Sequence, residues 1–310
     1  MKRVFLIAAL LTAWSSAAQI TDEQTIRVDS RILEVFNQHL YLGDFHSPRG
    51  LAFDRERKEL WVADTGNGVL SVHRREGVEL YAFRAGAHLI DPVRVSVAPN
   101  GDVLAIEGNR SRVRLFNYRG QYKNDLVLPG LDPKPIIGAA VYGPDGMLYV
   151  GDNKSSQVFV YDANLKLRFQ FGSHGTDDAQ FISICGIAFG PDGYVYVADQ
   201  VALAVQVFDA QGNFIRGWGK HEMGGEHVSL PSGIAINSKG HVLITDELRH
   251  QLKVYSAEGK FLANIGGLGD IPGRFSFPTD VAVDELDHVY VAERSTSRVQ
   301  ILELLYSTGD

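Results

Sequence analysis

The chain has 310 residues, of which 45% are hydrophobic and 22% charged, and its formal net charge is −7. This length and composition suffice for a large core in a single all-β domain. The acidic balance argues against nucleic-acid binding, which depends on clustered Lys and Arg.

The N-terminus has the pattern of a secretory signal peptide. Lys2 and Arg3 form a positive start, an apolar stretch runs from Val4 to Trp14, and small residues follow up to Ala18. The stretch is too short to anchor the chain, and no later run reaches about 18 apolar residues. The sequence therefore predicts a signal at 1–18, cleaved near Ala18, and one exported domain at 19–310. That domain should be periplasmic or extracellular and should have no membrane span.

After this signal, one unit recurs six times. In each copy an alternating stretch ends in an acid, and successive acids lie 43, 45, 47, 47 and 47 residues apart: Asp64, Glu107, Asp152, Asp199, Asp246 and Glu293. A stretch rich in small apolar residues precedes the acid, and two alternating stretches follow, with Gly in the turns. Four antiparallel strands per about 40–50 residues make a β-propeller blade.

The sixth copy ends after three strands, near Leu304. Residues from about Ile32 to Leu42 match the pattern of a fourth strand, so the N-terminal segment is predicted to complete the last blade. The alternative is a free N-terminal arm, which would leave that blade with a bare edge. The predicted fold is thus all-β: a six-bladed β-propeller of four-stranded antiparallel blades, closed by an N-terminal strand.

The fourth and fifth copies resemble NHL repeats, in CGIAFGPDGYVYVADQVALAVQVFDAQGNFIRGWG and PSGIAINSKGHVLITDELRHQLKVYSAEGKFLANIG. The likeness runs from about Ile32 to Leu304 and is weakest in the second copy, where PVRVSV replaces the usual Gly-Ile-Ala. The resemblance implies a six-bladed propeller of an exported bacterial type. It implies no single activity, because the family includes interaction domains and a peptide-amidating lyase.

The six acids recur in every copy, so we interpret them as braces of the scaffold and not as a metal site. Each carboxylate could accept N–H groups of the loop that follows it. It could also contact a long polar side chain near the next strand, the candidates being Arg112, Gln157, Gln251 and Arg298. Function is then expected where the copies differ.

One set of differences lies where the first strand of each copy begins, beside the central channel. The residues before the Gly-Ile-Ala step are Arg49, Val93, Ile137, Cys185, Ser232 and Thr279. The resemblance to the amidating lyase would require zinc-binding His at such positions, and none is His. Asp280 replaces the usual Gly. Together with Arg49 and Arg94 it is predicted to form a polar cluster at one channel mouth, either a solvated rim or a site for an anion or a peptide.

Other motifs for chemistry are sparse. Cys185 is the single cysteine, so no internal disulfide is expected, and we interpret it as a buried small hydrophobe. Gluconolactonase-like propellers hold a divalent cation in the channel, and their motifs do not stand out here. The sequence contains no nucleophile elbow, phosphate loop or haem-attachment motif. No cofactor is predicted, although a divalent metal in the channel stays open as an alternative.

These observations favour an exported, monomeric module that binds or scaffolds a protein or peptide partner on one propeller face. No catalytic and no metal-ligating residue is assigned. The alternative is a metal-assisted enzyme with its site at the channel, a gluconolactonase-like hydrolase or an amidating-lyase-like lyase. A third hypothesis is a domain of an envelope redox or secretion complex whose haem or flavin lies on another chain.

Overall fold

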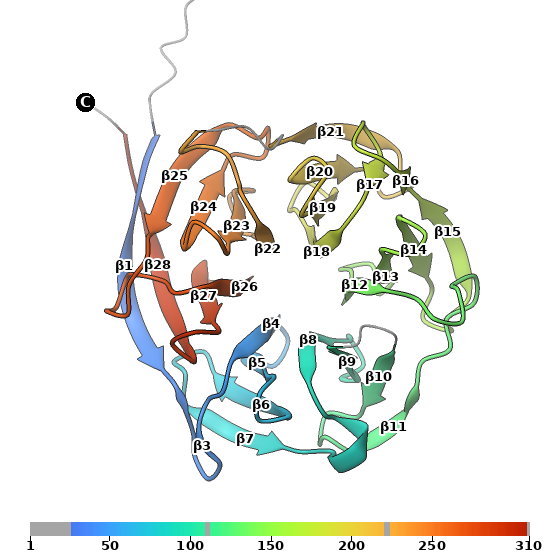
Figure 1. The fold of residues 1–310 in the computed structure, drawn as a ribbon, viewed down its shortest axis with the longest axis horizontal. Coiled ribbons are helices and arrows are strands. Elements are labelled where there is room, and N and C mark those ends of the chain that lie inside the picture. Colours follow the sequence, from blue (N-terminus) through green and yellow to red (C-terminus); the bar gives the residue numbers. More distant parts are fainter. Residues whose placement is uncertain (1–25, 109–111, 220–223, 309–310) are drawn as a thin grey trace, which may run out of the picture.

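The computed structural model describes residues 26–108, 112–219 and 224–308, so the predicted signal lies outside the described residues. The chain forms a six-bladed β-propeller of four-stranded antiparallel sheets, as predicted (Figure 1). Listed from the channel outward, the strands are β4 (Pro48–Asp54), β5 (Glu59–Asp64), β6 (Val69–Arg74) and β7 (Glu79–Phe83) in blade 1; β8 (Pro92–Val97), β9 (Val103–Glu107), β10 (Val113–Phe116) and β11 (Tyr122–Asp125) in blade 2; β12 (Ile137–Tyr142), β13 (Leu148–Asp152), β14 (Gln157–Tyr161) and β15 (Leu167–Phe171) in blade 3; β18 (Ile184–Phe189), β19 (Val195–Asp199), β20 (Val205–Phe208) and β21 (Phe214–Trp218) in blade 4; β22 (Pro231–Ile236), β23 (Val242–Asp246), β24 (Gln251–Tyr255) and β25 (Phe261–Gly266) in blade 5; and β26 (Pro278–Val283), β27 (His288–Glu293), β28 (Arg298–Thr308) and β1 (Ile26–Phe36) in blade 6.

Three small elements lie between the blades. They are the hairpin of β2 (Gln38–His39) and β3 (Gly43–Asp44), the 3₁₀ turn η1 (Gly86–His88), and the parallel pair of β16 (Ser173–His174) and β17 (Gln180–Phe181).

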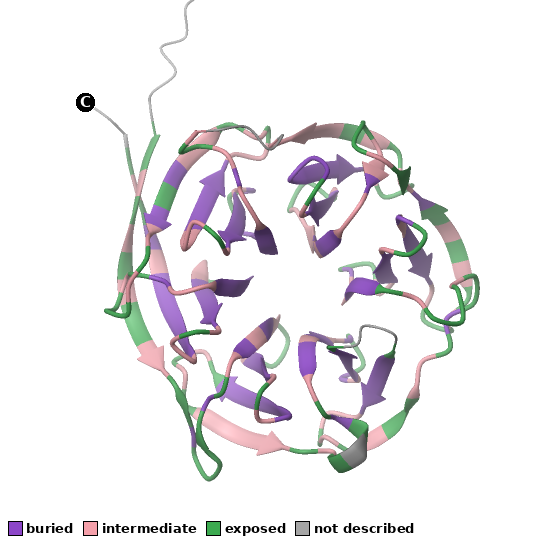
Figure 2. Cartoon of the chain, viewed as in Figure 1, coloured by how far each residue is buried: buried purple, intermediate pink, exposed green. Residues whose placement is uncertain are grey.

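The core lies between neighbouring blades. Alternation along β19 shows how it forms, because Tyr196 and Ala198 pack with side chains of blade 5, whereas Val195 and Val197 pack with those of blade 3. A strand that is covered on both faces reads as apolar at every position, and β19 is buried throughout. Figure 2 shows the inner strands buried and the outermost strands partly exposed.

The two faces of the ring are built differently. Because strands within a blade are antiparallel, the turns between first and second and between third and fourth strands share one face, which we call the turn face. The loops between second and third strands and the segments that connect blades share the other, which we call the crossover face. Gly146 and Gly193 occupy turns on the turn face with φ of 75° and 81°, as predicted for tight turns.

The N-terminal strand closes the ring. β1 pairs antiparallel with β28 from Ile26 with Thr308 to Phe36 with Val299. The predicted boundaries were wrong, since β1 ends at Phe36 and not near Leu42, and β28 continues past Leu304. The chain leaves the sheet after Phe36 because His39 is drawn into blade 1, as described below.

The end of β28 also fastens blade 6 to blade 5. The hydroxyl of Tyr306 accepts a hydrogen bond from the Asn237 side chain at 2.9 Å. Val28 and Ile32 of β1 pack against the core that blades 5 and 6 share. Both ends of the described chain therefore hold the last blade in place, and we call the paired strands β1 and β28 the clasp.

Candidate functional site

Every inner strand begins with a β-bulge beside the channel. In blade 5, Pro231 pairs with Asp246 and Gly233 pairs with Thr245, so Ser232 between them is the extra residue. The corresponding residues of the six blades are Arg49, Val93, Gly138, Cys185, Ser232 and Thr279.

Blade 3 corrects the alignment made from the sequence, which put Ile137 in the position of Ser232. Ile137 instead pairs with Asp152, as the prolines of four other blades pair with their acids. The bulge then falls on Gly138. None of the six bulged residues is His.

The residue after the bulge lies where neighbouring inner strands are most crowded. A Cβ on Gly50 would lie 2.8 Å from the Cα of Arg94, and one on Gly233 would lie 2.7 Å from the Cα of Asp280. Crowding of this kind selects Gly, and blade 3 has Ala139 in the same register. Arg94 and Asp280 are therefore the two charged residues within this ring of small ones.

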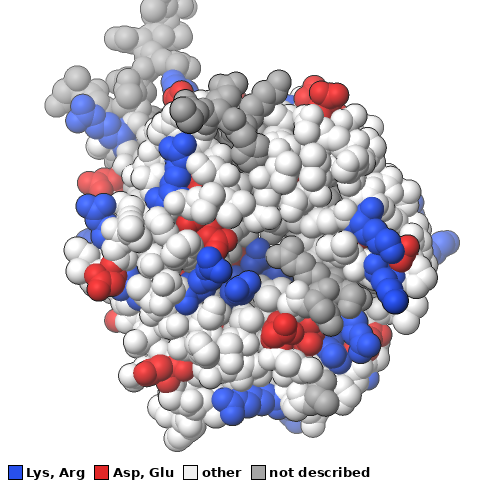
Figure 3. Space-filling model, in the orientation of Figure 1, with Lys and Arg blue, Asp and Glu red and all other residues white. Residues whose placement is uncertain are grey.

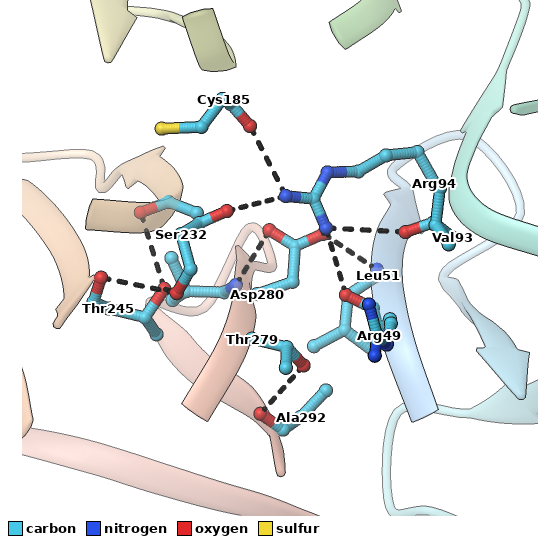
Figure 4. Close-up of polar contacts among 12 residues, drawn as sticks. Arg49, Leu51, Val93, Arg94, Cys185, Ser232, Thr245, Thr279, Asp280 and Ala292 are labelled. Carbon is cyan, nitrogen blue, oxygen red and sulfur yellow. Dashed lines mark hydrogen bonds and ion pairs between the residues drawn. The ribbon is translucent and has the colours of Figure 1, made fainter. Parts of the chain in front are cut away.

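Arg94 reaches across the channel and is held by main-chain oxygen atoms (Figure 4). One terminal nitrogen donates to the carbonyl oxygens of Arg49 at 3.0 Å and Val93 at 3.2 Å. The other donates to those of Ser232 at 2.6 Å and Cys185 at 3.3 Å. Since these carbonyls belong to blades 1, 2, 5 and 4, one side chain ties four blades together.

Asp280 on β26 connects blade 6 to Arg94 as well. Its Oδ2 lies 3.8 Å from the nearer nitrogen of Arg94 and accepts the N–H of Leu51 at 2.9 Å. Its Oδ1 accepts the N–H of Val281 at 3.0 Å. Burial raises the pKa of Asp280, and Arg94 and the two N–H groups oppose that shift. The structure thus brings Arg94 and Asp280 together as a polar pair inside the channel.

Arg49, the third residue of the predicted cluster, contributes only its carbonyl oxygen to this pair. Figure 4 shows its guanidinium without a contact to Arg94 or Asp280. Its Nε is buried and has no hydrogen-bond partner among the described residues. Arg49 is therefore the member of the cluster whose side chain still offers hydrogen-bond donors.

On the turn-face side of the Arg94–Asp280 pair, the channel holds a cavity of about 70 Å³. Mostly apolar residues line it, among them Leu51, Val141, Ile187, Ile234 and Val281. A water molecule takes about 30 Å³ in the liquid, so this space suits about two of them, whereas ligand pockets measure several hundred Å³. An organic ligand therefore has little room in this part of the channel.

The same geometry bears on a metal in the channel. Carbonyl and carboxylate oxygens are ligands that suit Ca²⁺, and several converge here. The guanidinium of Arg94 already lies among them and would repel a cation. Within residues 26–108, 112–219 and 224–308, no group of three or more His, Cys, Asp or Glu could hold a metal ion. The channel as built does not fit a divalent cation.

The acids at the strand ends act as braces. Asp199 accepts N–H groups of Ile182 and Ser183 from the segment before its blade, and of Val201 and Ala202 from the loop after it. The other five also accept an N–H from the segment that enters their blade: Asp64, Glu107, Asp152, Asp246 and Glu293. The sequence indicated the loop contacts but gave no sign of these crossover contacts.

The expected side-chain partners of the acids were mostly wrong. Arg298 does contact Glu293 at 2.7 Å. Arg112 instead pairs with Asp125, and Gln157 donates to the carbonyl of Gly172.

In blade 2 the partner of Glu107 is Arg114, at 3.3 Å. For Gln251 the described residues include no hydrogen bond to Asp246, although the two pair across strands.

Exposed large hydrophobic side chains gather on the crossover face. Within the described part of the chain, ten lie there: Leu40, Tyr41, Leu42, Ile90, Val127, Ile136, Val201, Leu248, Leu268 and Ile271. Val78 and Leu286 lie in turns of the turn face, and the others lie on outer strands. Large exposed apolar side chains are therefore more frequent on the crossover face than on the turn face.

The hairpin β2–β3 carries the most exposed of these side chains, since Tyr41 is 88% and Leu40 62% exposed. The hairpin projects beyond the ring, at the lower left of Figure 1. Its base is fixed by His39, whose ring nitrogens lie 2.9 Å from Asp64 and 2.7 Å from Glu79. Burial lowers the pKa of His39, but both carboxylates raise it, and the net shift is upward. The exposed apolar tip of the hairpin is thus anchored at its base by the contacts of buried His39 with two carboxylates.

Charge on this side of the molecule is mixed. Figure 3 shows mostly uncharged atoms, with small groups of Lys and Arg beside Asp and Glu. Binding to a phosphate backbone needs clustered basic residues, and this face offers no continuous basic surface. A search of the described residues for a helix that is long and apolar enough to cross a bilayer found none.

Comparisons with known proteins support the fold. Residues 229–255 and 275–302 match the NHL repeat, which confirms the predicted repeat type for blades 5 and 6. The sequence matches no curated protein.

Several solved structures resemble this chain in fold, at low sequence identity. Streptogramin B lyase has a TM-score of 0.65 at 13% identity, with 90% of this chain and 98% of that chain covered. Virginiamycin B lyase from Staphylococcus aureus has a TM-score of 0.59 at 12% identity, covering 90% and 100%. A catalytically inactive variant of that lyase with quinupristin gives 0.57 at 10%, with the same coverage.

Proposed function

We propose that this protein is a binding module that docks a protein partner on its crossover face. The observation that carries the proposal is the concentration of exposed hydrophobic side chains on that face, ten of them within the described residues. The closed channel supports it as well, because Arg94 fills the place where a small substrate or a metal would otherwise enter.

Docking would use a rigid frame with variable contacts. The strand-end acids fix the crossover segments, so the loops need little further ordering when a partner binds. Tyr41 and Leu40 would act as the anchor, since a Tyr on a rigid mount supplies large contact area at a small entropic cost. Arg49 would bind a carboxylate or carbonyl of the partner at the channel mouth through the terminal nitrogens of its guanidinium, which do not contact Arg94 or Asp280.

We further propose that docking takes place outside the cytoplasm and that the protein itself is a monomer. The N-terminal sequence supports export. Because the sequence has a single Cys, the exported protein would fold without an internal disulfide.

Site-specific photo-crosslinking would test the docking face. A photoreactive residue would replace Tyr41 or Leu248 on the crossover face, and Val78 or Leu286 on the turn face. We expect one discrete partner to crosslink from the first two positions only. The partner would then be purified, and the change of Tyr41 and Leu40 to Ser should weaken its binding at least tenfold, since hot-spot truncations cost about 2 kcal/mol or more.

Val78→Ser is the matched control, because Val78 is 60% exposed at a turn of the same blade but on the other face. Unchanged affinity is expected for it. Equal crosslinking from both faces, or no discrete product from the crossover positions, would contradict the proposal.

The alternative is a metal-assisted lactonase- or lyase-like enzyme, and the similarity in fold to streptogramin B lyase favours it. Such an enzyme would need its site away from the Arg94–Asp280 pair. Incubation of the metal-loaded protein with quinupristin, followed by mass spectrometry, tests this alternative directly. Conversion of quinupristin that depends on added metal would favour the enzyme over the binding module. Unchanged quinupristin would agree with the binding module.

A further inference from the structure

Blade 1 carries a second surface, on the turn face and away from the proposed docking face. Its two turns border an open, shallow groove of about 400 Å³. The groove is lined by Arg57, Lys58, Glu59, Arg74, Arg75, Glu76 and Leu80. The volume lies in the range of small-molecule sites. Four of these seven residues are cationic, in a chain whose net charge is −7.

Two of the four cations are fixed by neighbouring blades. Arg57 pairs with Asp54 at 3.0 Å and lies 4.4 Å above the ring of Tyr118 in blade 2. Arg75 pairs with Glu285 of blade 6. These contacts hold two guanidinium groups in place on the two sides of the groove.

The other two cations, Lys58 and Arg74, are exposed and have no ion pair with any residue that the structure describes. Lys58 adopts φ of 59°, the left-handed conformation that Gly146 and Gly193 adopt in the equivalent turns. Asp287 adopts the same conformation in the equivalent turn of blade 6, with φ of 64°. This turn position therefore accepts an exposed polar side chain as well as Gly.

Glu59 follows Lys58 in the chain and pairs with Arg74 across β5 and β6, and it offers an unused acceptor. Its Oε2 is buried and receives no hydrogen bond from the described residues. Burial, and secondarily the charge of Asp54, raises the pKa of Glu59. A buried acceptor without a donor is costly, and a ligand hydroxyl would satisfy it. Lys58 and Arg74 supply cations for carboxylate groups and Glu59 supplies an acceptor for a hydroxyl, so a ligand that carries both groups fits this lining.

We propose that this groove binds a hydroxylated carboxylate, either a free hydroxy acid or an acidic sugar unit of a polysaccharide. The ligand carboxylates would pair with Lys58 and Arg74, and a hydroxyl would donate to Oε2 of Glu59. This site is independent of the crossover face, so a partner bound there and a ligand bound here need not compete.

Calorimetric titration of the purified protein tests the ligand class with matched pairs of probes. Citrate and tricarballylate carry the same three carboxylates and differ by one hydroxyl, so citrate should bind about fivefold more tightly. Trigalacturonate should bind, whereas the neutral maltotriose should not. The tighter of citrate and trigalacturonate, by at least tenfold, identifies the free acid or the sugar as the source of the ligand. Failure of both to bind in the millimolar range, or equal affinities for citrate and tricarballylate, would overturn the proposal.

A pair of variants tests the location of the site. Arg74→Gln should weaken binding about tenfold, because it removes a charged donor from an exposed position that the fold does not need. Arg55→Gln is the matched control, since Arg55 is exposed in the first of the two turns but does not line the groove. Binding that both variants weaken equally, with melting temperatures unchanged, would place the ligand elsewhere.

Discussion

At the scale of single residues, Arg94 is the side chain that joins the blades across the channel. Its donors satisfy carbonyl groups of four blades, and Asp280 balances its charge. Removing one member of a buried pair is usually more costly than removing both, because the partner is left without compensation.

Arg94→Met should therefore lower the free energy of unfolding by about 3 kcal/mol, measured by urea denaturation. The variant should also gain stability as the pH falls from 7 to 5. Asp280 then lacks its counter-charge, burial raises its pKa in the folded protein above the unfolded value, and the folded state takes up the extra proton. Asp280→Asn in the Arg94→Met background should abolish this pH dependence. A variant as stable as the original protein would contradict the structural role.

His39 is a basic group whose titration also makes the stability of the protein depend on pH. Its pKa is raised in the folded state by Asp64 and Glu79, so its contribution to stability is complete below the unfolded pKa of about 6.5 and is lost as the pH rises through the folded value. The neighbouring His73, whose burial lowers its pKa to about 4, titrates well below this window. The original protein should thus lose more stability than His39→Gln between pH 6 and pH 9, as urea denaturation would show.

The candidate site could be predicted only in part. Arg49, Arg94 and Asp280 stood out because they break the repeat, and the structure brings Arg94 and Asp280 into contact. Their partners could not be predicted, because Arg94 binds main-chain carbonyls, which every sequence has. His39 was missed because it falls in the segment that was assigned to the last strand of blade 6, whereas that strand ends at Phe36. Only its position before a Leu-Tyr-Leu segment could have drawn attention to it.

At the scale of the elements, regular alternation made the strands and the blade count predictable, since both faces of a blade must be buried by its neighbours. The predicted residue positions were wrong where the same residues fit two alignments of the repeat. In blade 3 the run IIGAAV allows the bulge at Ile137 or at Gly138, and the pairing with Asp152 decides for Gly138. β1 was extended too far because the apolar residues of the β2–β3 hairpin continue its pattern.

The turns between first and second strands provide a test at this scale. Lys58 and Asp287 take the left-handed conformation that Gly takes in other blades, with φ of 59° and 64°. Lys58→Gly should raise the free energy of unfolding by up to about 1 kcal/mol, because it relieves this conformation. Asp287→Gly is the matched control and should not stabilise, since Asp287 also accepts hydrogen bonds from the N–H and hydroxyl of Ser238. Stabilisation of both variants alike would show that those bonds contribute little.

At the scale of the whole molecule, the two faces have different surfaces and the ring depends on its clasp. Crossover segments carry most of the exposed hydrophobic residues, whereas the turn face of blade 1 carries the cationic groove. A partner and a small ligand would then be bound on opposite sides of one rigid ring.

Deletion of residues 26–36 should destabilise the entire ring and not blade 6 alone, because it exposes β28 and the core shared with blade 5. We expect one cooperative transition at clearly lower urea, together with self-association through the bare edge of β28, seen by sedimentation. Ile26→Ser is the control, since this side chain is exposed and should have little effect. Separate unfolding of blade 6 at low urea, with the remainder unchanged, would contradict this view.

The clasp also decides how the molecule would respond to a mechanical load. Because Ile26 pairs with Thr308, the two ends of the described chain leave the ring side by side. A force applied between them would open β1 and β28 one pair at a time, like a zipper, instead of shearing all pairs at once. Tension on the ends would therefore open the ring at low force, even though we expect the closed ring to unfold in urea as one unit.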